Sequence, residues 1–236
     1  MNQLLARRAF AELLGTGLLV AVVVGSGIMA ARLSPNDVGL ELLENSTATA
    51  LGLSVLILIL GPVSGAHFNP VVTLGDFILG RRTGTGVDAK TVAAYIPAQI
   101  VGGIGGTILA NLMFALPAVT ASTHTRSSGH LWLGETVATA GLILLIFSLV
   151  RTGRGALAAP AVGAYIGAAY WSTSSTSFAN PAVTIARAFT DTFAGIAPGS
   201  VGGFVAFQVI GAAVGVGLVV VLYPHAEKLD PIERAS

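Results

Sequence analysis

Six long apolar stretches, each about the length needed to cross a lipid bilayer, limit what this chain can fold into more than any other feature. A spanning helix needs about 20 predominantly apolar residues. Only 10% of the 236 residues are charged, against about 25% in a typical soluble domain. We therefore expect an all-α membrane protein, a single domain over residues 1–236, with spans at residues 9–31, 40–60, 91–115, 131–150, 156–172 and 201–223.

The remaining composition excludes several classes of function. The chain has no cysteine, which excludes disulfides, thiolate catalysis and cysteine-based metal sites. The net charge is +1 and the basic residues are dispersed, so nucleic acid is not a credible partner. His124 and His130 are too isolated for a metal site, and no nucleophile–base pair lies at membrane depth. We expect no enzyme activity, no cofactor and no metal.

The basic residues are divided unequally between the two sets of connections. Connections on the cytoplasmic side of membrane proteins carry an excess of Lys and Arg. If both termini are cytoplasmic, only Arg32, Arg126 and Arg187 fall outside. The other nine fall inside, namely Arg7, Arg8, Arg81, Arg82, Lys90, Arg151, Arg154, Lys228 and Arg234. We therefore expect both termini in the cytoplasm, and the compact loops favour a multi-pass protein of a bacterial plasma (inner) membrane.

Two short apolar segments, residues 65–74 and 177–185, follow the second and fifth spans and are too short to cross a bilayer. In each segment a proline directly follows an asparagine, at Asn69 and at Asn180. Asparagine is a favoured helix cap and proline a favoured first helical residue. Both segments are therefore expected to form re-entrant half-helices that enter the membrane part-way.

The chain also repeats its own pattern, in residues 5–118 and 128–224. Each half runs through a span with a buried glutamate (Glu12 or Glu135), a second span, a half-helix and a third span. Three spans per half give the halves opposite orientations, and paired interrupted segments in inverted repeats indicate a transport site near the midplane. There, two positive helix N-termini and two asparagine amides would repel cations and prevent a proton relay through water.

Three segments carry a resemblance to a known family: AELLGT at residues 11–16, SGAHFNPVVT at 64–73 and NPAVT at 180–184. Over essentially the whole chain the sequence resembles the aquaporins, or major intrinsic proteins. The resemblance implies the aquaporin fold of six helices and two half-helices in an inverted repeat, a homotetramer, and one pore per subunit. It places His67 on the cytoplasmic side of the pore and assigns the pore motifs to Asn69, Pro70 and Val71 and to Asn180, Pro181 and Ala182. Val71 stands where the family usually has alanine.

The selectivity filter departs from the family pattern. Most members have an arginine directly after the second Asn-Pro-Ala, where this chain has Val183. Matching the pattern assigns the other filter positions to Ser177, to Ala168, and to either Leu51 or Thr49. Such a filter would be wide and uncharged.

Arg187 lies four residues beyond Val183, on the same helical face. One interpretation is that its charge replaces the missing filter arginine in the outer vestibule. The other is that Arg187 is a surface residue, snorkelling or paired with Asp191.

A carboxylate inside an apolar span is costly unless it has partners. For Glu12 and Glu135 we expect the role that the resemblance supports, which is to hold the backbone of the half-helix loops, rather than a proton relay. The function implied is a passive channel for water and small uncharged solutes such as glycerol, urea and arsenous acid, with ions and protons excluded. Its partners are these solutes and the lipid bilayer. The alternatives are a proton-coupled secondary transporter, a water-selective channel, and a structural tetramer sealed by bulky lining residues.

Overall fold

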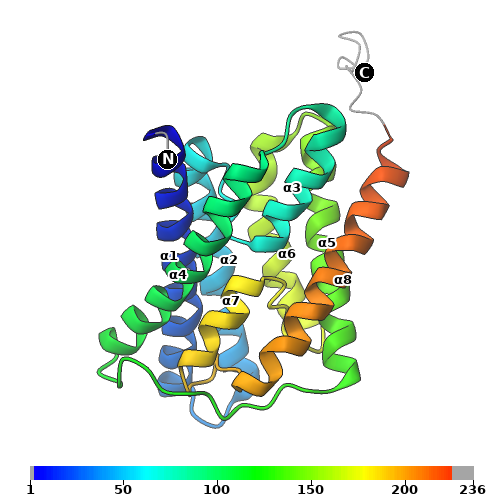
Figure 1. Ribbon diagram of the computed structural model, residues 1–236. Coiled ribbons are helices and arrows are strands. Elements are labelled where there is room, and N and C mark those ends of the chain that lie inside the picture. The colour runs from blue at the N-terminus through cyan, green and yellow to red at the C-terminus, as the bar shows by residue number, and fades with distance from the viewer. Residues whose placement is uncertain (1–2, 225–236) are drawn as a thin grey trace.

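The computed structural model describes residues 3–224, and that part of the chain consists of helices and connections without strands. The predicted all-α membrane fold is confirmed (Figure 1). The α-helices are α1 (Gln3–Leu33), α2 (Val38–Ser64), α3 (Pro70–Thr83), α4 (Ala89–Met113), α5 (Gly129–Arg151), α6 (Ala158–Ser172), α7 (Pro181–Ala186) and α8 (Pro198–Leu222). Two 3₁₀ turns, η1 (Gly155–Leu157) and η2 (Arg187–Phe189), complete the order.

Within the described residues, five helices are long and apolar enough to cross a membrane: α1, α2, α4, α5 and α8. The span expected at residues 156–172 is shorter, because α6 has 15 residues. The turn η1 leads directly into α6, and at about 1.5 Å per α-helical and 2.0 Å per 3₁₀ residue the two together extend for about 28 Å. That length nearly matches a hydrocarbon core of about 30 Å.

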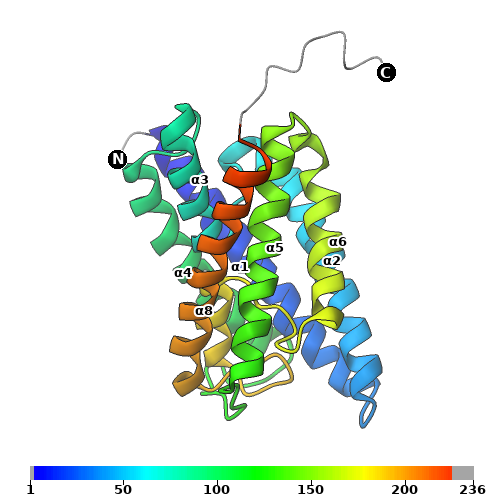
Figure 2. The same cartoon turned by 90° about the vertical axis from the view of Figure 1, so that its right-hand side faces the viewer.

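The two half-helices enter the bundle from opposite faces. In Figure 1, α1 begins and α8 ends at the same face, at the top of the view. Helix α3 starts in the middle of the bundle and runs to this face, whereas α7 starts in the middle and runs to the opposite one. Figure 2 shows α7 behind the lower half of α8, above the 114–128 connection. The halves are therefore inverted relative to each other.

Glycines let the long helices approach until their backbones touch. A Cβ atom at Gly102 of α4 would lie 2.1 Å from the carbonyl oxygen of Leu13 in α1. In the second half, a Cβ at Gly211 of α8 would lie 2.5 Å from the carbonyl oxygen of Thr136 in α5. Small residues serve this purpose in membrane helices. The pairs α1–α4 and α5–α8 thus occupy equivalent places in the two repeats.

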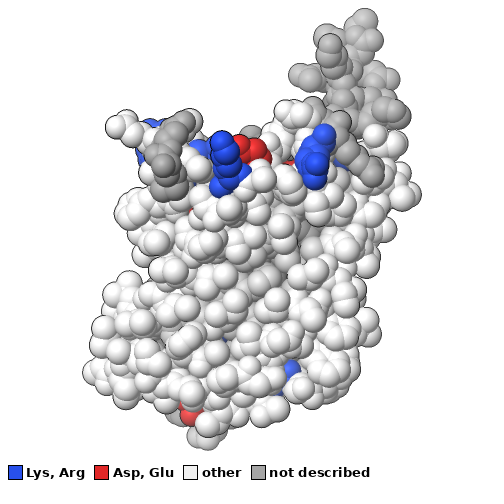
Figure 3. All heavy atoms as spheres, in the orientation of Figure 1, with Lys and Arg blue, Asp and Glu red and all other residues white. Residues whose placement is uncertain are grey.

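The charged side chains gather at the face where α1 begins and α8 ends, which we call the basic face (Figure 3). The surface between the two faces is almost entirely without charge in this view, and large apolar side chains such as Leu58 and Ile59 are exposed on α2. Such a surface suits lipid. Lys228 and Arg234, which enter the orientation argument, lie outside the described residues.

Candidate pore

A cavity of about 870 Å³ passes between the two half-helices. From the basic face it is lined by Arg8, Asp76 and Asp88, then by His67, Asn69 and Asn180, and toward the opposite face by Thr49, Tyr170, Ser177, Val183 and Arg187. Residues of both repeats line it, so the cavity lies where the inverted-repeat argument predicts a transport path.

The loops that lead into the half-helices have the same unusual backbone in both repeats. Ala66 and Phe68 have φ angles of 50° and 48°, and Ser177 and Ala179 have φ angles of 51° and 48°. Residues other than glycine rarely adopt this left-handed conformation. It costs on the order of 1–3 kcal/mol per residue and persists only where the surroundings fix it.

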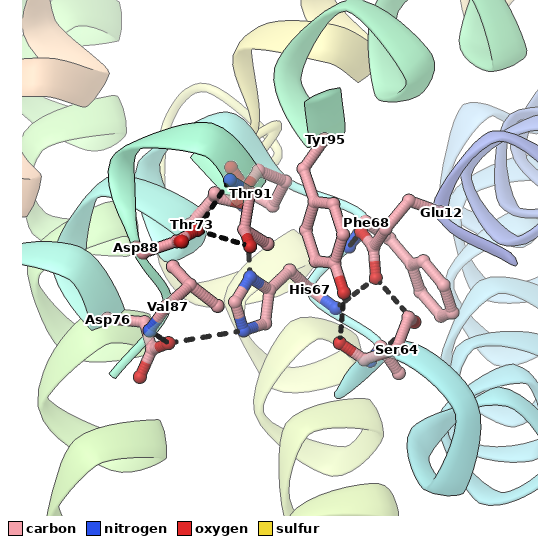
Figure 4. Close-up of polar contacts among 12 residues, drawn as sticks. Glu12, Ser64, His67, Phe68, Thr73, Asp76, Val87, Asp88, Thr91 and Tyr95 are labelled. Atoms are coloured by element: carbon pink, nitrogen blue, oxygen red, sulfur yellow. Dashed lines mark hydrogen bonds and ion pairs between the residues drawn. The ribbon is translucent and has the colours of Figure 1, made fainter. Parts of the chain in front are cut away.

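Glu12 fixes the first of these loops. Its carboxylate accepts hydrogen bonds from the backbone N–H groups of His67 (3.0 Å) and Phe68 (2.7 Å), and from the Ser64 hydroxyl (2.7 Å) (Figure 4). The side-chain amide of Gln99 donates a fourth bond at 2.7 Å. Glu12 is fully buried, and these four donors meet the acceptor capacity of a carboxylate.

Glu135 plays the same part in the second repeat. It is fully buried and accepts from the backbone N–H groups of Phe178 and Ala179, both at 2.9 Å. Gln208 donates to it at 2.5 Å. The two glutamates therefore form equivalent braces behind the cavity.

The sequence argument missed Gln99 and Gln208. Besides its glutamate, each amide also donates to a half-helix threonine: Gln99 to Thr73 at 3.0 Å and Gln208 to Thr184 at 2.8 Å. Both glutamines are fully buried, Gln99 in α4 and Gln208 in α8. Each glutamine lies in the third span of its repeat, and this correspondence between the repeats is the sequence signal that could have identified them.

Asn69 and Asn180 cap their half-helices, as the Asn-Pro spacing predicts. The Asn69 side-chain oxygen accepts from the N–H of Val71 at 3.1 Å. The Asn180 oxygen accepts from the N–H groups of Ala182 (3.0 Å) and Val183 (3.3 Å). Each cap satisfies N–H groups that a helix start leaves without an intrahelical partner.

The two asparagines also bind across the repeat boundary. The Asn69 amide donates to the carbonyl of Ala179 at 2.7 Å, and the Asn180 amide donates to the carbonyl of Phe68 at 2.8 Å. A primary amide carries two N–H groups, so each asparagine keeps one donor for the cavity that it lines. We call this pair of bonds the asparagine cross-link.

The other motif residues pack behind this point. Pro70 and Pro181 occupy the first helical turns, and both are buried. Val71 is 1% exposed and belongs to the hydrophobic core, and Ala182 is fully buried. Because Val71 packs away from the cavity, its bulk in place of the usual alanine does not narrow the path.

On α2, Thr49 and not Leu51 lines the cavity. Thr49 lines the cavity with Leu53 and Ile57, at intervals of four residues. Leu51 is 65% exposed on the outer surface of α2. A shift of two residues turns a side chain by about 200° around a helix, so the assignment of Leu51 is wrong.

The assignment of Ala168 is wrong for the same reason. The cavity-lining residues of α6 are Ala158, Val162, Ile166 and Tyr170, whereas Ala168 is exposed on the outer side. The Tyr170 hydroxyl lies 3.3 Å from the hydroxyl oxygen of Thr49 across the cavity wall. On α6, the residue that lines the cavity beside Thr49 is therefore Tyr170 and not Ala168.

Arg187 is buried at the cavity wall, and its interpretation as a surface residue is wrong. It is 3% exposed, its Nε donates to the carbonyl of Ala194, and its guanidinium carbon lies 3.4 Å from the centre of the Phe178 ring. Asp191 instead accepts from the backbone N–H (2.8 Å) and hydroxyl (2.9 Å) of Thr123. These bonds lower the pKa of the Asp191 carboxyl.

His67 lines the cavity, on the side of the basic face (Figure 4). Its Nδ1 lies 3.1 Å from the hydroxyl of Thr73, and its Nε2 lies 3.9 Å from a carboxylate oxygen of Asp76. The same Asp76 oxygen accepts from the N–H of Val87 at 2.9 Å. These contacts fix the imidazole at the wall of the path.

Two capped half-helices that meet beside a continuous cavity in a helical membrane bundle define a channel-forming protein. The model of the family named Major intrinsic protein matches residues 2–177. The chain belongs to the major intrinsic protein family, which consists of membrane channels and not of enzymes.

The curated relatives include an aquaglyceroporin, aquaporins and a propanediol uptake facilitator. Aquaglyceroporin AqpS of Rhizobium meliloti (strain 1021) is 51% identical over 214 residues, which cover 91% of this chain and 89% of that protein. Aquaporin-2 of Homo sapiens is 30% identical over 155 residues, covering 64% and 54%. The propanediol uptake facilitator PduF of Citrobacter freundii is 31% identical over 132 residues, covering 56% and 46%.

Among solved structures, the aquaglyceroporin from Plasmodium falciparum matches with a TM-score of 0.68. The match covers 98% of this chain and all of that chain, at 20% sequence identity. At this identity the likeness concerns the fold, and it agrees with the aquaporin fold described above.

Proposed function

We propose that this protein is a passive channel for small uncharged solutes, with glycerol-like polyols as the leading class and urea, arsenous acid and water as further permeants. The observation that carries the proposal is the wall of the cavity beside Asn180, where Val183 replaces the usual arginine. An apolar side chain there leaves space and removes a charge from the narrowest part of the family's pore. The 51% identity to an aquaglyceroporin supports the same solute class.

The lining of the cavity suits molecules with one polar and one apolar side. Hydrogen-bonding groups come from the two asparagines, Thr49 and Tyr170, and apolar contacts come from a larger set: Leu19, Val23, Leu53, Val72, Leu142, Ile146, Val162, Ile166 and Val183. A polyol can exchange its hydration for the polar groups while its carbon chain contacts the apolar ones. Such a lining disfavours ions, because it offers no full replacement for their hydration shell.

The coupled-transporter alternative depends on Glu12 or Glu135 taking up and releasing protons. Neither glutamate lines the cavity. Both are fully buried, and their carboxylates accept hydrogen bonds from neighbouring groups. We propose that both are structural.

Assembly and location are part of the proposal. We propose a homotetramer in a bacterial inner membrane, with both termini in the cytoplasm. The concentration of Lys and Arg at the face where α1 begins supports the orientation, and a relative in Rhizobium meliloti supports a bacterial membrane.

The decisive experiment is stopped-flow light scattering on proteoliposomes, with water, glycerol, urea and arsenous acid compared in the parent and in Val183→Arg. We expect rapid glycerol flux in the parent, reduced at least tenfold by the arginine while water flux persists. Val183→Ala is the matched control, because it changes the size of the residue without adding charge, and its glycerol flux should persist. Fast water flux without glycerol flux in the parent would identify a water channel. Uptake against a glycerol gradient that collapses with the proton gradient would identify a coupled transporter.

A further inference from the structure

Two arginines meet one aromatic ring where the cavity approaches the face opposite the basic face. The guanidinium carbon of Arg187 lies 3.4 Å from the centre of the Phe178 ring, and that of Arg126 lies 5.2 Å from it. Arg187 follows the second half-helix, whereas Arg126 belongs to the 114–128 connection. Segments far apart in the chain therefore place two positive charges beside Phe178 at one end of the path, where Arg187 lines the cavity and Arg126 lies behind the ring without lining it.

Both guanidinium groups are held rigidly. The Nε of Arg187 donates to the carbonyl of Ala194, and the Nε of Arg126 donates to the next carbonyl, that of Gly195, at 3.0 Å. The backbone N–H of Arg126 also donates to the Ser200 hydroxyl at 2.9 Å. One loop thus positions both charges.

The ring between the two arginines is fixed as well. The N–H of Phe178 donates to Glu135, and its ring packs against Phe204 with ring centres 5.1 Å apart. An arginine over an aromatic face is stabilised by the cation–π interaction. Phe178 can therefore hold Arg187 in place without a carboxylate.

The charge of this cluster is not neutralised by an ion pair. Among residues 3–224, neither Arg126 nor Arg187 forms an ion pair with a carboxylate. Both guanidinium groups lie against the same Phe178 ring, and the carboxylate of Glu135 binds the backbone N–H of that phenylalanine. The oxygens of Glu135, however, accept hydrogen bonds from Phe178, Ala179 and Gln208.

Arg187 also has donors to spare. Within the described residues the one hydrogen bond of its side chain goes to the carbonyl of Ala194, which accepts from the Nε–H. A guanidinium carries five N–H groups, and Arg187 lines the cavity. Its terminal NH₂ groups are therefore available to the contents of the path.

We propose that Arg187 and Arg126 together form the cation barrier of this channel, in place of an arginine at position 183. The inference rests on the proposed function as a channel for neutral solutes and assigns its charge selectivity. In this arrangement Thr49, Tyr170 and Val183 set the width of the path, and the arginine pair sets its charge. Because the positive charge lies one helical turn beyond Val183, the width of the path and its charge are set by different residues. The filter can therefore be wide and still exclude cations.

The test measures sodium and proton leak in proteoliposomes under an imposed membrane potential, together with glycerol flux in the same preparations. We compare the parent with Arg187→Gln, Arg126→Gln and the double variant. A positive charge a few ångströms from a permeating cation in a partly desolvated site changes its energy enough for an effect of about tenfold or more. We therefore expect the leak to rise about tenfold in each single variant and further in the double variant, with glycerol flux still measurable. Arg154→Gln, which removes an exposed charge on the opposite side of the protein, is the matched control and should leave both quantities unchanged.

Two further variants separate charge from folding. Arg187→Lys keeps the charge and loses the planar contact with Phe178, so it should remain largely impermeable to cations. Val183→Arg combined with Arg187→Gln moves the charge back by one turn, so it should restore the cation barrier while reducing glycerol flux. Monodisperse elution of each variant in detergent establishes that it folds.

The outcomes for the two proposals are distinct. If the folded double variant excludes cations as well as the parent while glycerol still passes, the arginine pair is not the barrier and the inference is overturned. An Arg187→Lys variant that leaks as much as Arg187→Gln would overturn it too, because charge would then not be the cause. A parent that passes no glycerol would instead overturn the proposed function.

Discussion

Glu12 and Glu135 are carboxylates in apolar helices whose described partners are hydrogen-bond donors and not cations. A buried ion pair would neutralise the charge but leave the loop backbone unbound. Here each carboxylate binds the loop backbone instead: Glu12 accepts from the N–H groups of His67 and Phe68, and Glu135 from those of Phe178 and Ala179. A carboxylate is suited to this role because both of its oxygens accept.

The first prediction at this scale concerns these braces. Glu12→Gln or Glu135→Gln replaces one accepting oxygen with an NH₂ group that faces backbone donors, and losing a buried charged acceptor costs about 3 kcal/mol. We expect a large fall in the yield of folded protein, measured by size-exclusion chromatography. Glu44→Gln is the control, because within the described residues the one hydrogen bond of the Glu44 side chain comes from the Ser34 hydroxyl, which an amide oxygen can still accept. A normal yield with selective loss of a proton-driven flux would contradict the structural role.

The second residue-scale prediction concerns the face of α6. Tyr170→Ala removes a lining ring and the contact with Thr49, so it should increase the flux of polyols larger than glycerol several-fold. Ala168→Leu changes a residue on the outer side and should leave this flux as it is. Stopped-flow measurements with a series of polyols check both. A response to Ala168→Leu and not to Tyr170→Ala would restore the original assignment.

The sequence patterns identified the capping asparagines and the glutamates that hold the loops. They did not identify which sides of α2 and α6 face the cavity, for a physical reason. Asn69, Asn180, Glu12 and Glu135 belong to local patterns that occur twice, so each occurrence supports the other. Which side of a helix faces the cavity depends on the rotation of that helix in the bundle, and two residues correspond to about 200°. A family pattern matched without the helix phase therefore selected Ala168 where the lining residue is Tyr170.

At the scale of elements, the half-helix loops adopt a strained backbone, and the long helices provide the side chains that hold it. The loops carry the left-handed residues Ala66, Phe68, Ser177 and Ala179, whose cost must be offset by their surroundings. The long helices supply those surroundings, since Glu12 and Gln99 come from α1 and α4, and Glu135 and Gln208 come from α5 and α8. The close α1–α4 and α5–α8 contacts therefore position the braces as well as packing the bundle.

The prediction at this scale concerns the close contact between α4 and α1 at Gly102. A Cβ there would lie 2.1 Å from the carbonyl oxygen of Leu13, so Gly102→Ala should push α4 away from α1. Overpacking of this kind costs about 1–3 kcal/mol, and we expect a lower thermal unfolding temperature in detergent together with reduced glycerol flux. Gly105→Ala in the same helix is the matched control, because a Cβ at Gly105 meets no atom within 4 Å. Equal stability of the two variants would mean that the contact at Gly102 does not limit how closely α4 and α1 pack, because helix propensity alone favours alanine at both positions.

For the whole molecule, the absence of cysteine allows a direct test of orientation. Ala121→Cys places a thiol in the 114–128 connection, and Ala156→Cys places one in the turn between α5 and α6; both parent residues are exposed. In intact bacterial cells, a membrane-impermeant maleimide should label the first variant, and the second only after permeabilisation. The reverse pattern would place the termini outside.

The overall architecture could be predicted from the sequence because the length of an apolar stretch and the internal repeat are properties of whole segments, and they do not depend on the contacts of single residues. The six spans lie close to their expected places, although α6 is short, and both half-helices begin at their Asn-Pro motifs. Helix α3 continues to Thr83, well beyond the segment 65–74 that was expected. The cluster around Phe178 could not be predicted, because Arg126 reaches it from a connection with no regular pattern. Such a contact depends on how the loop folds over the face.

The asparagine cross-link has a consequence for how the protein is made. Asn69 and its acceptor Ala179 are separated by 110 positions in the chain, and Asn180 and Phe68 by 112. At roughly 5–20 residues per second, a ribosome needs roughly 5–20 s to add the missing partners. Until then the first half-loop lacks the hydrogen bonds that cross the repeat boundary, so neither loop has its full set of partners before the second half-helix has been made.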